Sequence, residues 1–233
     1  MNNITQIKRL SLWIFFLPLI AINLCLYISI NYDLLDNTIF AVDQIGRSGF
    51  TIPYIDGSIS ISRASRTFPQ YLIFKPAMFL TAFFLFLYWK KNNVLLNNLN
   101  NNSLVYKFKV FGFLSAIFLI LHSIFLGIKF DIQLYKLFRR IILLAFIIFE
   151  IVAQGLLVYQ IYKVRKKIKE ISNPLILKFK IFLVSVLAIV AILSLPILVS
   201  KGFTHFKHAL EWNYFVGVSI FYLLTNLFWK RTT

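Results

Sequence analysis

Six long apolar runs limit what this chain can fold into. A helix needs about 20 mainly apolar residues to cross the hydrocarbon core of a bilayer, and in lipid the backbone polar groups must be paired within the chain. The sequence therefore predicts an all-α polytopic membrane protein, residues 1–233 forming one integral membrane domain. The predicted spans of this six-helix bundle are residues 10–30, 71–89, 110–128, 141–161, 181–200 and 214–229.

Composition supports this class of protein. The chain is 59% hydrophobic and only 14% charged, whereas soluble domains are about half apolar and a quarter charged. The net charge of +17 does not indicate nucleic-acid binding, because the basic residues gather at the ends of apolar runs, where membrane topology places them. The single cysteine, Cys25, excludes an internal disulfide. No cofactor motif occurs, so we expect no cofactor.

The distribution of lysine and arginine predicts the orientation. Segments on the N-terminal side of the membrane, such as 162–180, carry many basic residues and almost no acid, while the other side mixes both. Positive segments face the cytoplasm. We therefore expect both termini inside, a long outer loop at 31–70 and, in a bacterium, the inner membrane.

The outer loop ends in a dense polar segment at 53–71. Its Asp56-Gly57 pair indicates a turn. In an extended chain, Ser60 and Ser62 share one face. In a helical turn, Arg63 and Arg66 point the same way, and paired guanidinium groups suit phosphate. Alternatively, this is a capped loop whose arginines pair with nearby aspartates.

Histidines and one acid form a second candidate cluster. In a helix, His205, His208 and Glu211 would share one face, and His122 lies in the outer half of the third span. Imidazole and carboxylate are zinc ligands, but the spacing matches no zinc signature. We therefore predict no metal site and keep a metal-dependent hydrolase as an alternative.

Polar residues within the apolar runs form a third group. Glu150 and Gln154 share a helix face in the fourth span, and His122 is the third intramembrane polar residue. An acid at this depth is a proton site or polar anchor, or it is a protonated group in an interhelical hydrogen bond. Arg140 begins the fourth span and Asn213 the sixth.

Two short motifs resemble those of a known family. Ser60-Ile61-Ser62-Arg63-Ala64 followed by Pro69-Gln70-Tyr71, and Ala209-Leu210-Glu211-Trp212, are similar to the signature of the six-span family that contains the damage-regulated autophagy modulators, the Frag/Sfk-type proteins and the N-terminal domain of Cwh-type proteins. One branch remodels GPI-anchor lipids. The resemblance implies six spans, cytoplasmic termini, and a serine loop that faces Glu211. Pro53–Gly57 departs from that pattern.

The leading functional hypothesis is recognition or handling of a lipid headgroup at the outer face, with membrane lipids as partners. Glu211, with His208, would act as base or orienting acid if a reaction occurs. The expected binding residues are Asp56, Ser60, Ser62, Arg63, Arg66, Arg140 and Asn213. The alternatives are the metal-dependent hydrolase, a non-catalytic scaffold for a membrane-protein partner, and a small transporter coupled to protons through Glu150.

Overall fold

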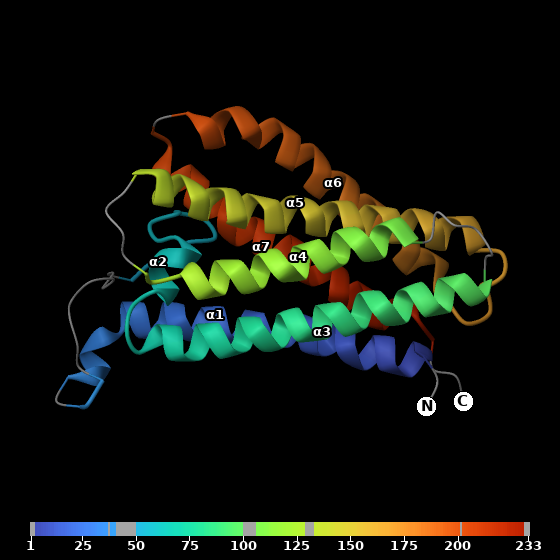
Figure 1. Ribbon diagram of the computed structural model, residues 1–233, viewed down its shortest axis with the longest axis horizontal. Helices are drawn as coiled ribbons and strands as arrows, with labels where there is room; N and C mark the ends of the chain where they lie inside the picture. Colours follow the sequence, from blue (N-terminus) through green and yellow to red (C-terminus); the bar gives the residue numbers. More distant parts are fainter. Residues whose placement is uncertain are drawn as a thin grey trace.

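The computed structural model describes residues 3–36, 38–40, 50–99, 106–128, 133–200 and 202–230, and within these ranges the chain is helical without a strand (Figure 1). The predicted all-α class is confirmed. The elements are α1 (Asn3–Ile30), the 3-10 helix η1 (Tyr32–Leu35), α2 (Ile61–Ser65), α3 (Gln70–Leu99), α4 (Tyr106–Phe125), α5 (Gln133–Val164), α6 (Pro174–Val199) and α7 (Thr204–Phe228).

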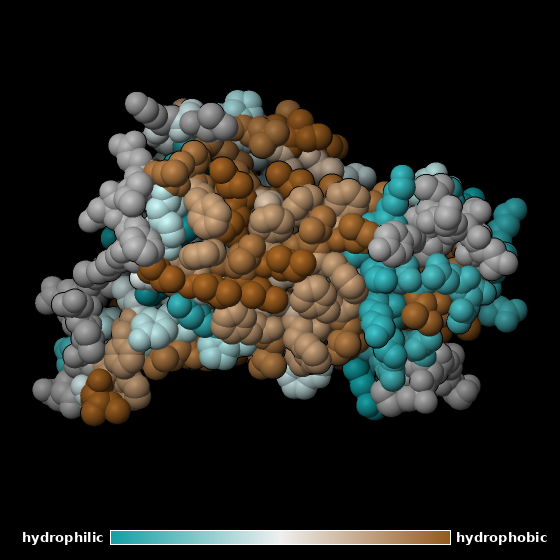
Figure 2. Space-filling view, viewed as in Figure 1, coloured by the Kyte–Doolittle hydropathy of each residue, from teal (hydrophilic) through white to brown (hydrophobic). Residues whose placement is uncertain are grey.

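Five of the described helices are long and apolar enough to cross a membrane, namely α1, α3, α4, α5 and α6. They fit an integral membrane protein with several spans. The sixth predicted run lies in α7, whose 25 residues extend about 37 Å. Polar residues such as Glu211, Asn213 and Asn226 lower the mean hydropathy of α7, so α7 is not among these five helices. A hydrophobic belt covers the middle of the molecule in Figure 2.

Helix α1 shows how the bundle fits an integral membrane protein. Its buried residues, among them Ile7, Ile14 and Ala21, recur every three or four positions and form one stripe. The other side is apolar as well, since Trp13 is 57% exposed and Ile20 56% exposed. A helix that is apolar all round is stable where protein covers one face and hydrocarbon the other.

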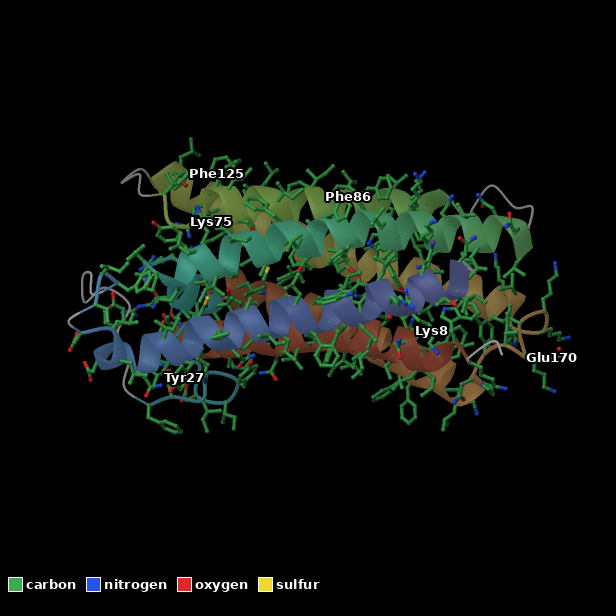
Figure 3. All side chains as sticks on the ribbon, turned by 90° about the horizontal axis from the view of Figure 1, so that it is seen from below. Lys8, Tyr27, Lys75, Phe86, Phe125 and Glu170 are labelled. Atoms are coloured by element: carbon green, nitrogen blue, oxygen red, sulfur yellow. The ribbon has the colours of Figure 1, made fainter. Side chains whose placement is uncertain are left out.

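The six long helices form a closed ring. Helix contacts run from α1 to α3, α4, α5, α6, α7 and back to α1. At one end, here called the terminal end, α1 begins and α7 ends, and Lys8 Nζ donates a 2.6 Å hydrogen bond to the carbonyl of Trp229. Figure 3 places Lys8 and Glu170 at this end, and Tyr27 and Lys75 at the other. That other end, here called the loop end, carries α2 and residues 50–69 (Figure 1).

Two helices differ from the sequence expectation. The second predicted span ends at residue 89, but α3 continues to Leu99 because Asn92 and Leu96, one turn apart, are buried against the core. Lys180 is expected among the charges of segment 162–180. Helix α6 instead begins at Pro174, capped by the Asn173 side chain, and Lys180 is fully buried in its second turn.

Close helix packing leads to a stability prediction. A Cβ on Gly112 would overlap the ring of the buried Trp89, whereas a Cβ on Gly155 would make an ordinary contact at 3.4 Å with Val184. We expect Gly112→Ala to lower the free energy of unfolding by about 1–3 kcal/mol through overpacking. Gly155→Ala, the matched control, should be neutral or stabilising. Thermal unfolding in detergent measures both, and equal midpoints would contradict this packing.

Candidate functional site

The chain before α2 is tied into a compact loop by Asp56. Its carboxylate accepts hydrogen bonds from the Ser58 N–H at 2.8 Å, the Ile52 N–H at 2.9 Å and the Thr51 hydroxyl at 2.9 Å. These bonds, that of Ser58 first, lower the pKa of Asp56 to about 2. The expected ligand-binding carboxylate therefore has its oxygens occupied within its own loop.

Gly57 brings this loop into direct contact with α7. Its φ of +60° lies in the left-handed region, and a Cβ there would overlap the carbonyl oxygen of His205. The Gly57 carbonyl accepts a 2.9 Å hydrogen bond from His208 Nδ1. Burial lowers the pKa of His208, which favours the neutral imidazole with its proton on that nitrogen.

Three further side chains of α7 bind the backbone of segment 54–62. Trp212 Nε1 donates to the carbonyl of Ile59 at 2.8 Å, and Asn213 Nδ2 donates to that of Tyr54 at 2.8 Å. Glu211 Oε1 accepts from the Ser62 N–H at 3.4 Å. With His208, four side chains within two turns of α7 hold this loop. The structure thus brings together Glu211 and the serine segment, as the family resemblance implies.

The serines do not continue as an extended chain. Ser60 is the N-cap of α2, and its Oγ accepts from the Arg63 N–H at 3.1 Å. The chain is helical from Ile61 to Ser65, so Ser62 does not continue the alternation of exposed hydroxyls. A serine in extended conformation before a helical turn is a typical cap, and this local signal separates Ser60 from Ser62.

Positive charge gathers beside this loop. Arg63 and Arg66 are both exposed, on α2 and at its C-cap. Burial, then the charges of Arg139 and Arg63, lower the pKa of Arg66. The Arg66 carbonyl approaches Gly127 at the end of α4, where a Cβ would be 3.1 Å away. Arg63, Arg66 and Arg139 are called the arginine group below. The expected binding residue Arg140, next to Arg139 in sequence, is exposed.

A central cavity lies inside the ring of helices, with about 90 Å³ accessible to water-sized molecules and part of it open to the surroundings. Its lining comes from α1, α2, α3, α4, α5 and α7 and is mainly apolar, including Ile61, Phe146 and Phe215. From Glu211 near the loop end to Tyr222 at the bottom, α7 advances about 16 Å. The cavity therefore extends over about half the thickness of a bilayer core.

Glu150 lies at the bottom of this cavity. Its carboxyl oxygens accept hydrogen bonds from the Ser115 and Tyr222 hydroxyls and, at 3.1 Å, from Gln154 Nε2. Ser115 lies on α4 and Tyr222 on α7, so the acid joins three helices. His122, the third intramembrane polar residue, lines the same cavity and packs edge-on against Phe74.

Sequence reasoning missed the polar partners that surround Lys180. Its Nζ donates to Thr225 Oγ1 at 2.7 Å and lies 3.8 Å from the ring centre of Phe221. The Asn173-Pro174 pair, a cap followed by proline at the first helical position, is a helix-start signal. It places Lys180 inside a helix, although it does not reveal Thr225.

Comparison of the chain with family models, curated proteins and solved structures found no match. Across the described ranges, no three histidine, cysteine or acidic side chains gather into a group that could hold a metal ion. His205 is exposed, while His208 binds the Gly57 carbonyl and His122 lines the cavity.

The contact at Gly57 predicts how the loop detaches. Gly57→Ala should speed proteolytic cleavage within residues 50–60 about tenfold or more, because losing the hydrogen bonds to α7 removes about 1 kcal/mol each. Gly202→Ala is the matched control, since Gly202 also has a positive φ, +94°, but has no atom within 4 Å of its Cβ position. If Gly57→Ala were cleaved within residues 50–60 no faster than Gly202→Ala, the contact with α7 would not be what holds the loop.

Glu211 predicts a pH dependence of stability. Burial raises its pKa to about 7, and the Ser62 N–H offsets this only in part. Below about pH 4.5 both folded and unfolded chains hold the proton. As the pH rises towards 7 only the unfolded chain releases it, so the folded state loses stability. Relative to that of wild type, the free energy of unfolding of Glu211→Gln should therefore rise by roughly 2 kcal/mol between pH 5 and pH 8. Unfolding measured across this range checks it, and a constant difference would contradict it.

Proposed function

We propose that the protein binds a membrane lipid, with the phosphate of its headgroup at the arginine group and one apolar chain in the central cavity. The observation that carries the proposal is an apolar cavity that reaches Glu211 and Ile61 beneath the α2 loop, beside exposed arginines. Ligand sites are typically of this kind, a mainly apolar cavity with a few placed polar groups.

The proposal includes the topology. Helix α7 serves as the sixth span, both termini lie in the cytoplasm, and the loop end faces outwards. Lys90 and Lys91 in α3, and the basic residues after α5, lie towards the terminal end, in keeping with positive segments on the cytoplasmic side. In a bacterium this membrane would be the inner membrane.

The energetics assign specificity to the headgroup. Moving a lipid chain from the bilayer into an apolar cavity gains little, because both surroundings are hydrocarbon. A charge-assisted hydrogen bond contributes about 1.5–3 kcal/mol. Arg66 experiences the positive charges of Arg139 and Arg63, and a phosphate would relieve that repulsion. The arginine group, rather than the cavity walls, thus selects the lipid.

Glu211 and His208 hold the loop over the cavity in this proposal. Their polar atoms already bind the backbone at Ser62 and Gly57. A role for either as an acid or base stays a prediction, as does the family resemblance. The dispersed histidines do not favour the alternative of a metal-dependent hydrolase.

The arginine group predicts which lipids remain bound. Purified protein is washed with detergent and the retained lipids are quantified by mass spectrometry against the bulk lipid of the host membrane. Wild type should retain a selected phospholipid, and Arg66→Gln and Arg139→Gln should each reduce its amount about tenfold, the equivalent of about 1.4 kcal/mol.

Arg140→Gln is the matched control and should retain the lipid, because Arg140 is exposed and next to Arg139 in sequence. Retention of lipid in bulk proportions, unchanged by any of the three substitutions, would contradict the proposal. Loss only in Arg140→Gln would move the phosphate to that side chain.

A further inference from the structure

A buried lysine begins a chain of polar side chains through the bundle. Lys180 on α6 is 0% exposed, and its Nζ donates to Thr225 Oγ1 on α7 at 2.7 Å. The same Thr225 hydroxyl lies 3.1 Å from the hydroxyl of Tyr88 on α3. An amine buried at this depth is costly unless it is partnered, and it is typically functional.

The chain continues towards the cavity. The rings of Tyr88 and Tyr222 pack edge to face with centroids 5.0 Å apart, and the Tyr222 hydroxyl donates to Glu150 Oε1. Tyr88, Tyr222 and Thr225 are all at most 1% exposed. Four helices thus contribute to a row of side chains from Lys180 to the bottom of the cavity. Hydrogen bonds join Lys180 to Thr225, Thr225 to Tyr88, and Tyr222 to Glu150, while a ring contact joins the two tyrosines.

We propose that Glu150, at the floor of the central cavity, and Lys180 form one electrostatically coupled proton-binding unit, with the side chains of Tyr222, Tyr88 and Thr225 between them. The unit has an ionised state, carboxylate with ammonium, and a neutral state, carboxyl with amine. In passing from the first to the second, Lys180 Nζ releases one proton and Glu150 gains one. The proton lost at Lys180 Nζ equals the proton gained at the Glu150 carboxylate, so the unit's net charge is unchanged.

Aromatic rings and more distant ionisable groups surround Glu150 and Lys180. Tyr88 and Tyr222 interact electrostatically with Glu150, and His122 and Glu211 line the same cavity further towards the loop end. On the lysine side, Phe221 and Phe228 present their rings to the ammonium. At the terminal end, Lys8 binds the carbonyl of Trp229. This inference does not rest on the arginine group or on a bound lipid.

Helix geometry gives the expected strength of the coupling. A Cβ on Gly155 would contact Val184, so these two residues lie at the same level of the bundle. Gly155 follows Glu150 by five residues on α5, and Val184 follows Lys180 by four residues on α6. These steps add to an axial separation of roughly 13 Å. At an effective dielectric constant of about 20, unit charges at this distance change each other's protonation by about one pH unit.

The test is labelling by an apolar carbodiimide, which reacts with protonated carboxyl groups. The carboxyl proton moves to a carbodiimide nitrogen while the carboxylate oxygen bonds to the central carbon, and rearrangement gives a stable N-acylurea. Labelling of Glu150 is followed by peptide mass spectrometry across a pH series on purified full-length protein. We expect Glu150 to be labelled at low pH. Glu150→Gln removes that signal.

Lys180→Met should raise the pH of half-maximal labelling by about one unit, because the ionised carboxylate loses its positive partner. Lys178→Met, the control, removes an exposed lysine of the same helix and should leave the midpoint unchanged. Thr225→Val removes the hydroxyl that accepts the hydrogen bond of Lys180, with little change of side-chain volume. It should also raise the pH of half-maximal labelling. In the double variant with Lys180→Met, Thr225→Val should add little to the shift of the labelling midpoint.

No labelling of Glu150 at any pH, or the same midpoint in wild type, Lys178→Met and Thr225→Val, would overturn the proposal. Thr225→Val keeps the test valid if Lys180→Met does not fold, which thermal unfolding reveals. Additive shifts in the double variant would show two independent groups rather than one unit, and would overturn it as well.

Discussion

The docking of segment 54–62 on the first turns of α7 is the contact on which the rest of this end of the molecule depends. Gly57 permits the close approach, and side chains from His208 to Asn213 bind the loop backbone. This contact fixes α2 over the bundle, and α2 in turn sets the position of Arg63 and Arg66 and brings Ile61 to the cavity. The loop is thereby ordered by hydrogen bonds to α7 and by the burial of Ile59 and Ile61.

The surrounding hydrocarbon decides which interactions can distinguish one ligand from another. In water an apolar cavity gains free energy by removing a chain from solvent, but a chain that comes from a bilayer has already left water. In the proposed function, the polar arginine group near the loop end therefore carries the selectivity. For the same reason a buried pair such as Lys180 and Thr225 is held firmly, since no water competes for it.

Sequence reasoning predicted the helical class and the five helices that are long and apolar enough to cross a membrane, because apolar runs of bilayer length have few other solutions. It also predicted that the serine segment and Glu211 would meet, by resemblance rather than by physics. It missed the burial of Lys180, because burial depends on which side of a helix meets which neighbour, and a helix apolar all round has no periodicity that reveals this. Ser60 was placed in an extended strand-like segment where its capping role favours a helix start.

The most direct measurement for the lipid proposal is photo-crosslinking with a phospholipid that carries a photoactivatable group along its acyl chain. In reconstituted membranes, peptides bearing Phe146 and Phe215, which line the cavity, should be labelled, and excess unmodified phospholipid should compete. Ile192 and Leu193 of α6 are 66% and 69% exposed and report labelling by bulk lipid, which does not saturate. Labelling confined to such exposed positions, with none in the cavity, would contradict the account.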